Sequence, residues 1–291
     1  MTSEPLLITG GSGTIGWYLC RHFAGKGTPV IGTYDRNRLQ ELPGLQLPLE
    51  EPERLAAILA NRTCSALIHT AAMTAPDLCE REPERTHRVN VQATRRLLEW
   101  LPSETPFIYF STDLVFDGKR GLYREEDRAN PVNRYGESKL LAESLVLKRP
   151  NSIILRIAKV ISPGSPSHPD FIDWMRERFQ AGQELPLFSD QFRSHLWVGD
   201  IAAAVEAILA QGIQAPLYHL GGPARQSRLD LGRAYARAAG FTEKLIRPIR
   251  MQDAGLVVRG ADCSLNSQRI ARDYGLRTTP VEEAMEMLVG R

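Results

Sequence analysis

Tyr135 and Lys139 are the residues of this sequence whose types and spacing first suggest chemistry. They lie four positions apart at the start of an apolar-periodic run that continues to Val146 and predicts a helix. Positions i and i+4 share one helix face, so the phenol and the ammonium can point into one cleft. A nearby ammonium favours phenolate and lowers the tyrosine pKa from its usual value of about 10. The pair is therefore expected to donate or accept a proton near neutral pH.

Three polar residues end a predicted buried strand. The strand is predicted over residues 107–113, which begin with an apolar and aromatic run and end in Ser111, Thr112 and Asp113. The carboxyl ends of strands line the ligand crevice of an open parallel sheet. We therefore expect these three side chains to face the place where chemistry occurs.

A glycine-rich turn near the N-terminus predicts a dinucleotide site. Residues 5–9 form a short apolar run, Gly10, Gly13 and Gly16 follow it, and an amphipathic segment then continues to about residue 26. Between a strand and a helix, such glycines permit a tight turn, close approach to a pyrophosphate and close helix packing. The free N–H groups of the helix start, at Thr14 and Ile15, are then expected to bind the phosphates.

The end of the second predicted strand, residues 29–33, bears on the choice of dinucleotide. A carboxylate there would bind the ribose hydroxyls of NAD, whereas an arginine would bind the 2′-phosphate of NADP. The chain continues Tyr34-Asp35-Arg36-Asn37-Arg38, so the carboxylate position falls on Tyr34 and Asp35 comes one residue late. The two arginines favour NADP and leave NAD open.

Two further segments belong to the cofactor side. Small residues, Ala71 among them, follow the predicted strand 66–69 and leave room for a flat ligand against the backbone. Asn90 lies inside a helix predicted over residues 83–100, where an asparagine is unfavourable by propensity and suggests a side-chain hydrogen-bonding role. His69 is expected to be a satisfied core histidine.

The positioning elements alternate between strand and helix along the chain, which predicts an α/β fold with a parallel sheet. Beyond the elements above we expect strands at 152–157 and 216–220, helices at 52–61 and 171–181, and a helix starting within 196–203 with Asp200 as its N-cap. A loop rich in turn formers, residues 162–169, marks a change of texture. Residues 1–160 and 196–222 are assigned to a nucleotide-binding domain, and residues 161–195 and 223–291 to a smaller, mostly helical lobe that closes over the crevice.

Composition narrows the function classes. The chain has 291 residues, is 43% hydrophobic and 24% charged, and carries a formal net charge of +2 with acids and bases mixed. This pattern excludes a basic nucleic-acid stripe. Four separated cysteines and six histidines without a close ligand pair argue against a metal site and for a reducing, cytoplasmic setting. No apolar segment is long enough to span a bilayer, so we expect no membrane partner. The glycine turn and the Tyr135/Lys139 pair lead us to expect a small-molecule substrate.

The glycine turn, the polar strand end and the Tyr135/Lys139 pair together resemble the extended short-chain dehydrogenase/reductase family. More narrowly, the segments 9–16, 111–118 and 135–140 resemble the dTDP-4-dehydrorhamnose reductase branch, which includes a non-catalytic relative, the regulatory β subunit of methionine adenosyltransferase. The resemblance covers essentially the whole chain. It implies a Rossmann-type doubly wound parallel sheet with a smaller, mostly helical C-terminal substrate lobe.

The resemblance also implies roles for single residues. Hydride would pass from the nicotinamide to a substrate carbonyl while Tyr135 protonates the oxygen, Lys139 lowers the tyrosine pKa and binds the nicotinamide ribose, and Thr112 holds the carbonyl oxygen. Asn90 resembles a supporting asparagine of the family. Substrate contacts are expected from Asp113, Lys159 and Arg193. Segments 85–100 and 134–147 resemble those of a family dimer contact, which implies a homodimer.

Three departures from the branch leave alternatives open. Leu114 stands where many members have a tyrosine, Lys159 where an aromatic residue contacts the substrate, and Pro48 near the position of an acidic residue beside the adenine. Leu114 cannot accept a proton, so dehydration is disfavoured. Besides a reductase acting on a sugar-like or nucleotide-linked carbonyl compound, the sequence allows an epimerase that retains NAD and a cofactor-binding regulatory subunit without turnover.

Overall fold

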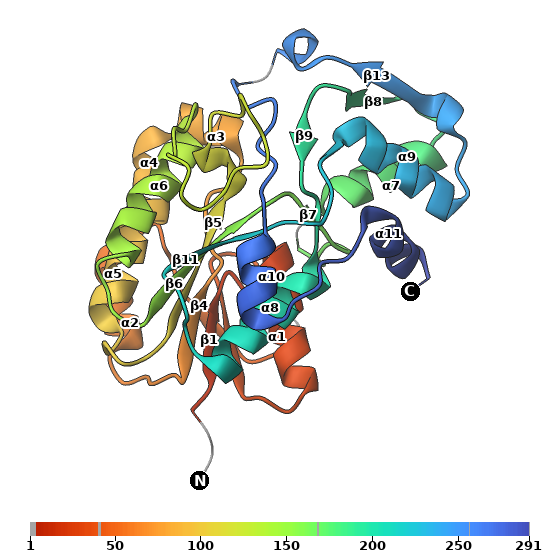
Figure 1. The fold of residues 1–291 in the computed structure, drawn as a ribbon. Coiled ribbons are helices and arrows are strands. Elements are labelled where there is room, and N and C mark those ends of the chain that lie inside the picture. The colour runs from red at the N-terminus through yellow and green to blue at the C-terminus, as the bar shows by residue number, and fades with distance from the viewer. Residues whose placement is uncertain (1–3, 40–41, 168, 256, 291) are drawn as a thin grey trace.

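The central element is a seven-stranded parallel sheet (Figure 1), seen in a computed structural model that describes residues 4–39, 42–167, 169–255 and 257–290. The predicted domain limits Met1 and Arg291, and His168 of the predicted loop, lie outside these ranges. The strand order is β11-β6-β5-β4-β1-β2-β3, and neighbours are parallel throughout. The strands are β1 (Leu6–Thr9), β2 (Val30–Tyr34), β3 (Gly44–Gln46), β4 (Ala66–His69), β5 (Phe107–Thr112), β6 (Ser152–Ile157) and β11 (Leu217–Leu220). The expected strands are confirmed, and β3 is an addition.

Alternating side chains of the strands bury both faces of this sheet. Leu6 and Ile8 of β1 enter one hydrophobic cluster, and Leu7 enters another on the opposite face. Figure 1 shows the resulting three layers. One face is covered by α1 (Thr14–Gly25), α8 (Val198–Gln211) and α10 (Gln268–Tyr274), and the other by α2 (Pro52–Leu59), α5 (Ala93–Trp100) and α6 (Arg134–Val146).

A smaller lobe lies to one side of the sheet (Figure 1). Its own hydrophobic cluster joins α7 (Phe171–Gln180), α9 (Arg228–Ala239) and α11 (Val281–Val289) to β8 (Leu185–Phe188), which pairs with β13 (Ile246–Ile249). Two further short pairs connect the parts, β7 (Val160–Ile161) with β10 (Leu196–Trp197), and β9 (Phe192–Arg193) with β12 (Gln226–Ser227). Ile270 and Tyr274 of α10 pack in the sheet cluster, so part of the segment assigned to the lobe covers the sheet. The domain division itself stays a prediction.

The helix expected over 83–100 is present, and a π-helical turn (Arg88–Gln92) lies between its α4 (Pro83–His87) and α5 portions; α3 (Pro76–Arg81) precedes it. One local prediction was wrong. Asp200 is not the N-cap of α8, which begins at Val198 after Trp197. Its carboxylate instead accepts hydrogen bonds from the backbone N–H and the hydroxyl of Thr279, at 2.8 and 2.7 Å. This partner lies 79 residues away, beyond the reach of a local pattern.

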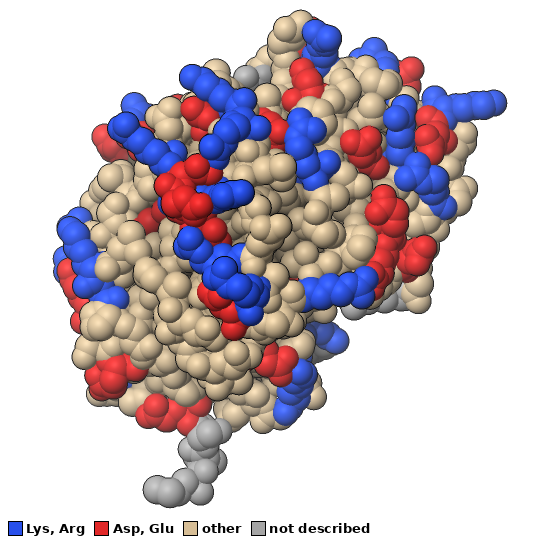
Figure 2. All heavy atoms as spheres, viewed as in Figure 1, with Lys and Arg blue, Asp and Glu red and all other residues tan. Residues whose placement is uncertain are grey.

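The surface charges are of both signs. Figure 2 shows Lys and Arg side chains interspersed with Asp and Glu on the face in view. Among the residues that the structure describes, no helix is both long and apolar enough to cross a membrane.

Candidate active site

One large cleft, of about 910 Å³, opens along the carboxyl ends of the sheet strands and continues against the lobe. Most of the residues predicted to bind or react lie on its wall. They are Gly10, Gly13, Thr14, Ile15, Gly16, Asp35, Arg36, Ala71, Thr112, Asp113, Tyr135, Lys159 and Arg193. Lys139 and Asn90 are buried behind the described wall rather than on it.

The glycine turn leaves space and free donors for a phosphate. A Cβ on Gly16 would lie 2.2 Å from the carbonyl oxygen of Gly10, so a side chain there would displace the turn. The N-cap residue of α1 is Gly13, so no side chain caps the first turn of this helix. Thr14 and Ile15 of that turn lie on the cleft wall. Unpaired backbone N–H groups at a helix start bind anions. These residues therefore fit a dinucleotide pyrophosphate.

The far end of the cleft carries both signs of charge. Arg36 Nη2 lies 3.5 Å from Glu50 Oε1, and Arg36 Nε lies 3.6 Å from Asp35 Oδ2. Arg85, which the sequence reasoning missed, also pairs with Glu50 and lowers the pKa of that carboxyl group. In the sequence, Arg85 is one of several charged residues of alternating sign between positions 80 and 88, a pattern that does not indicate a contact with Glu50. The carboxylate and the guanidinium groups expected here are thus both present.

The wall of the cleft also includes two apolar residues, Leu47 and Leu49. Pro48, which lies between them in the sequence, is absent from the described lining.

Thr112 and Tyr135 come together where β5 ends and α6 begins. The Asn133 side chain caps α6 by accepting a hydrogen bond from Gly136 N at 2.9 Å. A Cβ on Gly136 would lie 2.1 Å from the carbonyl oxygen of Leu114, so the start of α6 packs directly on the segment after Thr112. Thr112 and Tyr135 both line the cleft, and Thr112 lies close enough to the Tyr135 phenol to influence its pKa. A carbonyl oxygen in the cleft could therefore meet two hydroxyl groups.

The predicted lowering of the Tyr135 pKa was wrong for this structure. Burial raises the pKa of Tyr135 above its usual value, and the Thr112 side chain opposes that rise only in part. Burial also lowers the pKa of Lys139 to about 7, against the attraction of Glu143. The Lys139 ammonium lies 4.1 Å from the centre of the Tyr109 ring and is not among the charges that shift the pKa of Tyr135.

Asn90 has the hydrogen-bonding role that its sequence position predicted. Its Oδ1 accepts a bond from Met73 N at 2.8 Å, and its Nδ2 donates to Met73 O at 3.0 Å and to Ser138 Oγ at 2.9 Å. Asn90 lies in the π-helical turn, a type of turn that is frequent at functional sites. Asn90 therefore shapes the cleft through Met73, which lies on the wall.

His69 is the satisfied core residue that the sequence predicted. Its ring nitrogens lie 2.6 Å from Thr9 Oγ1 and 3.0 Å from Thr94 Oγ1. Burial lowers its pKa to about 3, so it stays neutral. The residue thus has no free ring nitrogen for catalysis.

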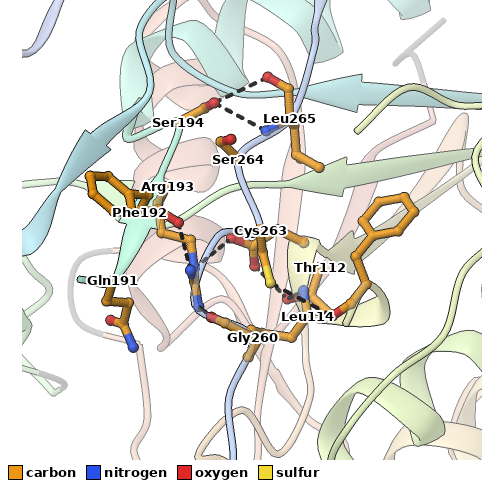
Figure 3. Close-up of polar contacts among 12 residues, drawn as sticks. Thr112, Leu114, Gln191, Phe192, Arg193, Ser194, Gly260, Cys263, Ser264 and Leu265 are labelled. Carbon is orange, nitrogen blue, oxygen red and sulfur yellow. Dashed lines mark hydrogen bonds and ion pairs between the residues drawn. The ribbon is translucent and has the colours of Figure 1, made fainter. Parts of the chain in front are cut away.

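The opposite end of the cleft is rich in cations. Arg193 reaches from β9 toward Gly260, as Figure 3 shows, and donates to Gly260 O at 3.0 Å and Phe192 O at 2.6 Å. Its Nε lies 3.2 Å from Asp113 Oδ2. Burial raises the pKa of Asp113, and the positive charge of Arg193 opposes that rise.

Neighbouring contacts fix this arrangement. The Ser194 hydroxyl donates a hydrogen bond to Leu265 O and accepts one from Leu265 N, each at 3.1 Å (Figure 3). Sequence reasoning missed Gln191, Arg228 and Arg259, which share this wall. The antiparallel pairing of β9 with β12, Gln226 opposite Arg193, brings Arg228 to the site. No local sequence pattern indicates that pairing.

Comparison with known proteins gives a consistent result. The family described as RmlD substrate binding domain matches residues 4–291. The probable low-salt glycan biosynthesis reductase Agl14 of Haloferax volcanii is 30% identical over 252 residues, which cover 84% of each chain. The dTDP-4-dehydrorhamnose reductase of Mycolicibacterium smegmatis is 30% identical over 250 residues, 84% of this chain and 72% of the relative.

Two further similarities are to a regulatory-family relative by sequence and to a solved structure by fold, and the second bears on the fold alone. Methionine adenosyltransferase 2 subunit beta of Xenopus laevis is 27% identical over 288 residues, 95% of this chain and 84% of the relative. The fold matches the crystal structure of a dTDP-4-dehydrorhamnose reductase from Bacillus anthracis in complex with NADP, with a TM-score of 0.86, 20% identity and 98% of both chains covered.

Proposed function

The chain belongs to the RmlD substrate-binding domain family, the dTDP-4-dehydrorhamnose reductase-like branch of the extended short-chain dehydrogenases/reductases, and we propose that it reduces a nucleotide-linked keto-sugar. It does so as an NAD(P)-dependent oxidoreductase of that branch. The observation that carries the proposal is the meeting of Thr112 and Tyr135 in the cleft that the glycine turn opens. Two hydroxyl groups beside a dinucleotide site are what carbonyl reduction requires.

NADPH supplies a hydride when bound, and the residues of the chain supply the rest. Gly16 and the α1 N-terminus would hold the pyrophosphate, and the Thr112 hydroxyl would orient the carbonyl oxygen. Tyr135 would protonate that oxygen as negative charge develops on it. The raised pKa of Tyr135 keeps its proton in place until that moment. Lys139, buried behind the cleft wall, would hydrogen-bond the nicotinamide ribose.

Substitution of Tyr135 tests this mechanism. Tyr135→Phe should lower turnover of keto-sugars by about 100-fold or more, as expected for loss of a general acid, while NADP binding is kept. Tyr18→Phe, in α1 and off the described cleft wall, is the matched control and should keep full turnover. Unchanged turnover of Tyr135→Phe would exclude the mechanism.

NADP is the proposed preferred cofactor over NAD. Arg36 supports this preference because its guanidinium lies on the cleft wall with a side chain that is 73% exposed and so free to turn toward a 2′-phosphate. Asp35 on the same wall leaves NAD as the alternative.

A cofactor-binding regulatory subunit is the second candidate. One observation favours it: the Lys139 ammonium lies over the Tyr109 ring and does not shift the pKa of the Tyr135 phenol. Similarity to methionine adenosyltransferase 2 subunit beta points the same way. NADPH binding without oxidation across a panel of keto-sugars, together with co-purification of a partner enzyme, would select this candidate.

Retention of cofactor separates an epimerase from a reductase. An epimerase would release stoichiometric NAD on denaturation, whereas the proposed reductase should exchange its cofactor freely.

The assembly and setting are also proposals. A homodimer through α5 and α6 is supported by two α6-side leucines, Leu141 and Leu147, which are 46% and 52% exposed. A cytoplasmic setting is supported by the four cysteines, all unpaired and buried.

A further inference from the structure

The substrate end of the cleft holds more positive than negative charge. Its cations are Lys159, Arg193, Arg228 and Arg259, and its acids are Asp113 and Asp170. Both acids have structural partners. Asp113 lies against Arg193, and Asp170 caps α7 by accepting bonds from Ile172 N at 2.8 Å and Asp173 N at 3.1 Å.

Two of the cations are already engaged. Arg193 is held by backbone carbonyl groups and by Asp113, and Arg259 pairs with Asp77. The charges of Arg193 and Arg259 are therefore already balanced by groups of the protein.

Lys159 and Arg228 are different. Within the described ranges, neither lies within 4 Å of a carboxylate. Arg228 donates to Gln191 Oε1 at 2.6 Å and lies 4.5 Å from the centre of the Phe171 ring, and both partners are neutral. The two cations also repel each other. Burial and this repulsion lower the pKa of Lys159 to about 8, and the negative charges of Asp170 and Asp113 oppose that lowering only in part. Positive charge in a cleft without a carboxylate partner is costly, and an anion in the cleft would offset that cost.

These cations lie close to the proposed reaction centre. The positive charges of Arg193, Lys159 and Arg228 each lower the pKa of Asp113, against the effect of burial. Asp113 Oδ1 also accepts a 3.2 Å hydrogen bond from the Thr112 hydroxyl. An anion on Lys159 and Arg228 would therefore sit near a carbonyl held by Thr112.

We propose that the carbonyl-bearing part of the substrate itself carries an anionic group, a carboxylate or a phosphate ester, which is seated on Lys159 and Arg228. This inference rests on the proposed reductase function and specifies its substrate class. The substrate is then a nucleotide-linked keto-sugar whose sugar ring bears an acidic group or a phosphate ester, rather than a neutral deoxysugar.

Paired ligands test the inference through binding to the protein saturated with NADP⁺. UDP-glucuronate against UDP-glucose tests a carboxylate, and glucose 6-phosphate against glucose tests a phosphate. By calorimetry, the acidic member of at least one pair should bind about ten-fold more tightly or better, as expected for charge-assisted hydrogen bonds. The pair that shows the preference identifies the group. Equal binding within both pairs, or no binding of any member, would overturn the proposal.

Variants show whether Lys159 and Arg228 cause the preference. Lys159→Met and Arg228→Met should each reduce it, and the double variant should abolish it while NADP⁺ affinity is kept as a check of folding. Arg250→Met, an exposed arginine of the same lobe, is the matched control and should keep the preference. A preference that survives in the double variant would place the anion elsewhere and refute the assignment.

Because the readout is binding, the two proposals can fail separately. Acid preference without turnover of any keto-sugar would leave the anion site standing and remove the reductase function. Turnover restricted to neutral keto-sugars would do the reverse.

Discussion

Lys139→Met should make the protein more stable while abolishing turnover. The ammonium is buried, and its pKa is lowered from 10.5 to about 7. Since one pKa unit corresponds to about 1.4 kcal/mol, linkage puts the cost of this lysine at pH 7 on the order of 4 kcal/mol. Its contact with the Tyr109 ring returns about 0.5–2 kcal/mol. Methionine keeps the apolar stem, so a net gain of about 2–3 kcal/mol in the free energy of unfolding is expected.

The pH dependence has a defined sign. Between pH 7 and 10.5 the unfolded chain binds more protons at this lysine than the folded protein does, so the stability of the wild type rises with pH. The variant lacks this contribution. The burial cost should therefore shrink from on the order of 4 kcal/mol at pH 7 to about 1 kcal/mol at pH 10, and the advantage of the variant should disappear.

Urea denaturation at several pH values, without added cofactor, measures this difference. Lys148→Met, at the exposed end of the same helical segment, is the control and should change stability by less than about 0.5 kcal/mol at any pH. A Lys139→Met variant that is less stable at pH 7, or an advantage that does not change with pH, would refute the assignment of a buried, destabilising ammonium.

Three further outcomes follow from the cleft. Arg36→Ala should weaken NADP binding by about five- to ten-fold and leave NAD binding unchanged in fluorescence titrations, and equal losses for both would contradict a 2′-phosphate contact. Asn90→Ala should leave the partly buried N–H and C=O of Met73 without their side-chain partner and lower the unfolding free energy by about 1–3 kcal/mol in chemical denaturation; a loss below about 0.5 kcal/mol would contradict it. Gly16→Ala should reduce NADP affinity by at least about ten-fold because the added carbon would lie 2.2 Å from a backbone oxygen, whereas Gly25→Ala, with nothing within 4 Å, should bind normally. Equal affinities of these two glycine variants would show that the turn does not hold the phosphates.

Local patterns were sufficient for most of the sheet. The buried runs at β1, β4 and β5 are short, largely apolar and followed by glycine or polar residues, so their position and order could be predicted. The polar strand end at Thr112 and the helix at Tyr135 followed in the same way, because each depends on neighbours in the chain. The π-helical turn at Arg88–Gln92 could not be predicted, since it depends on what Asn90 contacts across the fold.

Long-range contacts explain the failures. Arg228 reaches the cleft only because β9 pairs with β12, and Arg259 only because residues 259–262 pack beside β9. The pKa of Tyr135 was misjudged for a related reason. Helix spacing places Lys139 on the same face as Tyr135, but its ammonium contacts the Tyr109 ring, which comes from β5. Burial, and not the charge of Lys139, dominates the pKa of Tyr135. Spacing predicts neighbours on one element, and it does not predict burial.

Transfer of deuterium from the 4-position of labelled NADPH to a keto-sugar tests the central claim most directly. With a panel that includes dTDP-4-dehydrorhamnose and acidic keto-sugars, mass spectrometry should find one deuterium at the reduced carbon of at least one product, and none with Tyr135→Phe. Tight NADPH binding without deuterium in any product would contradict carbonyl reduction by this cleft.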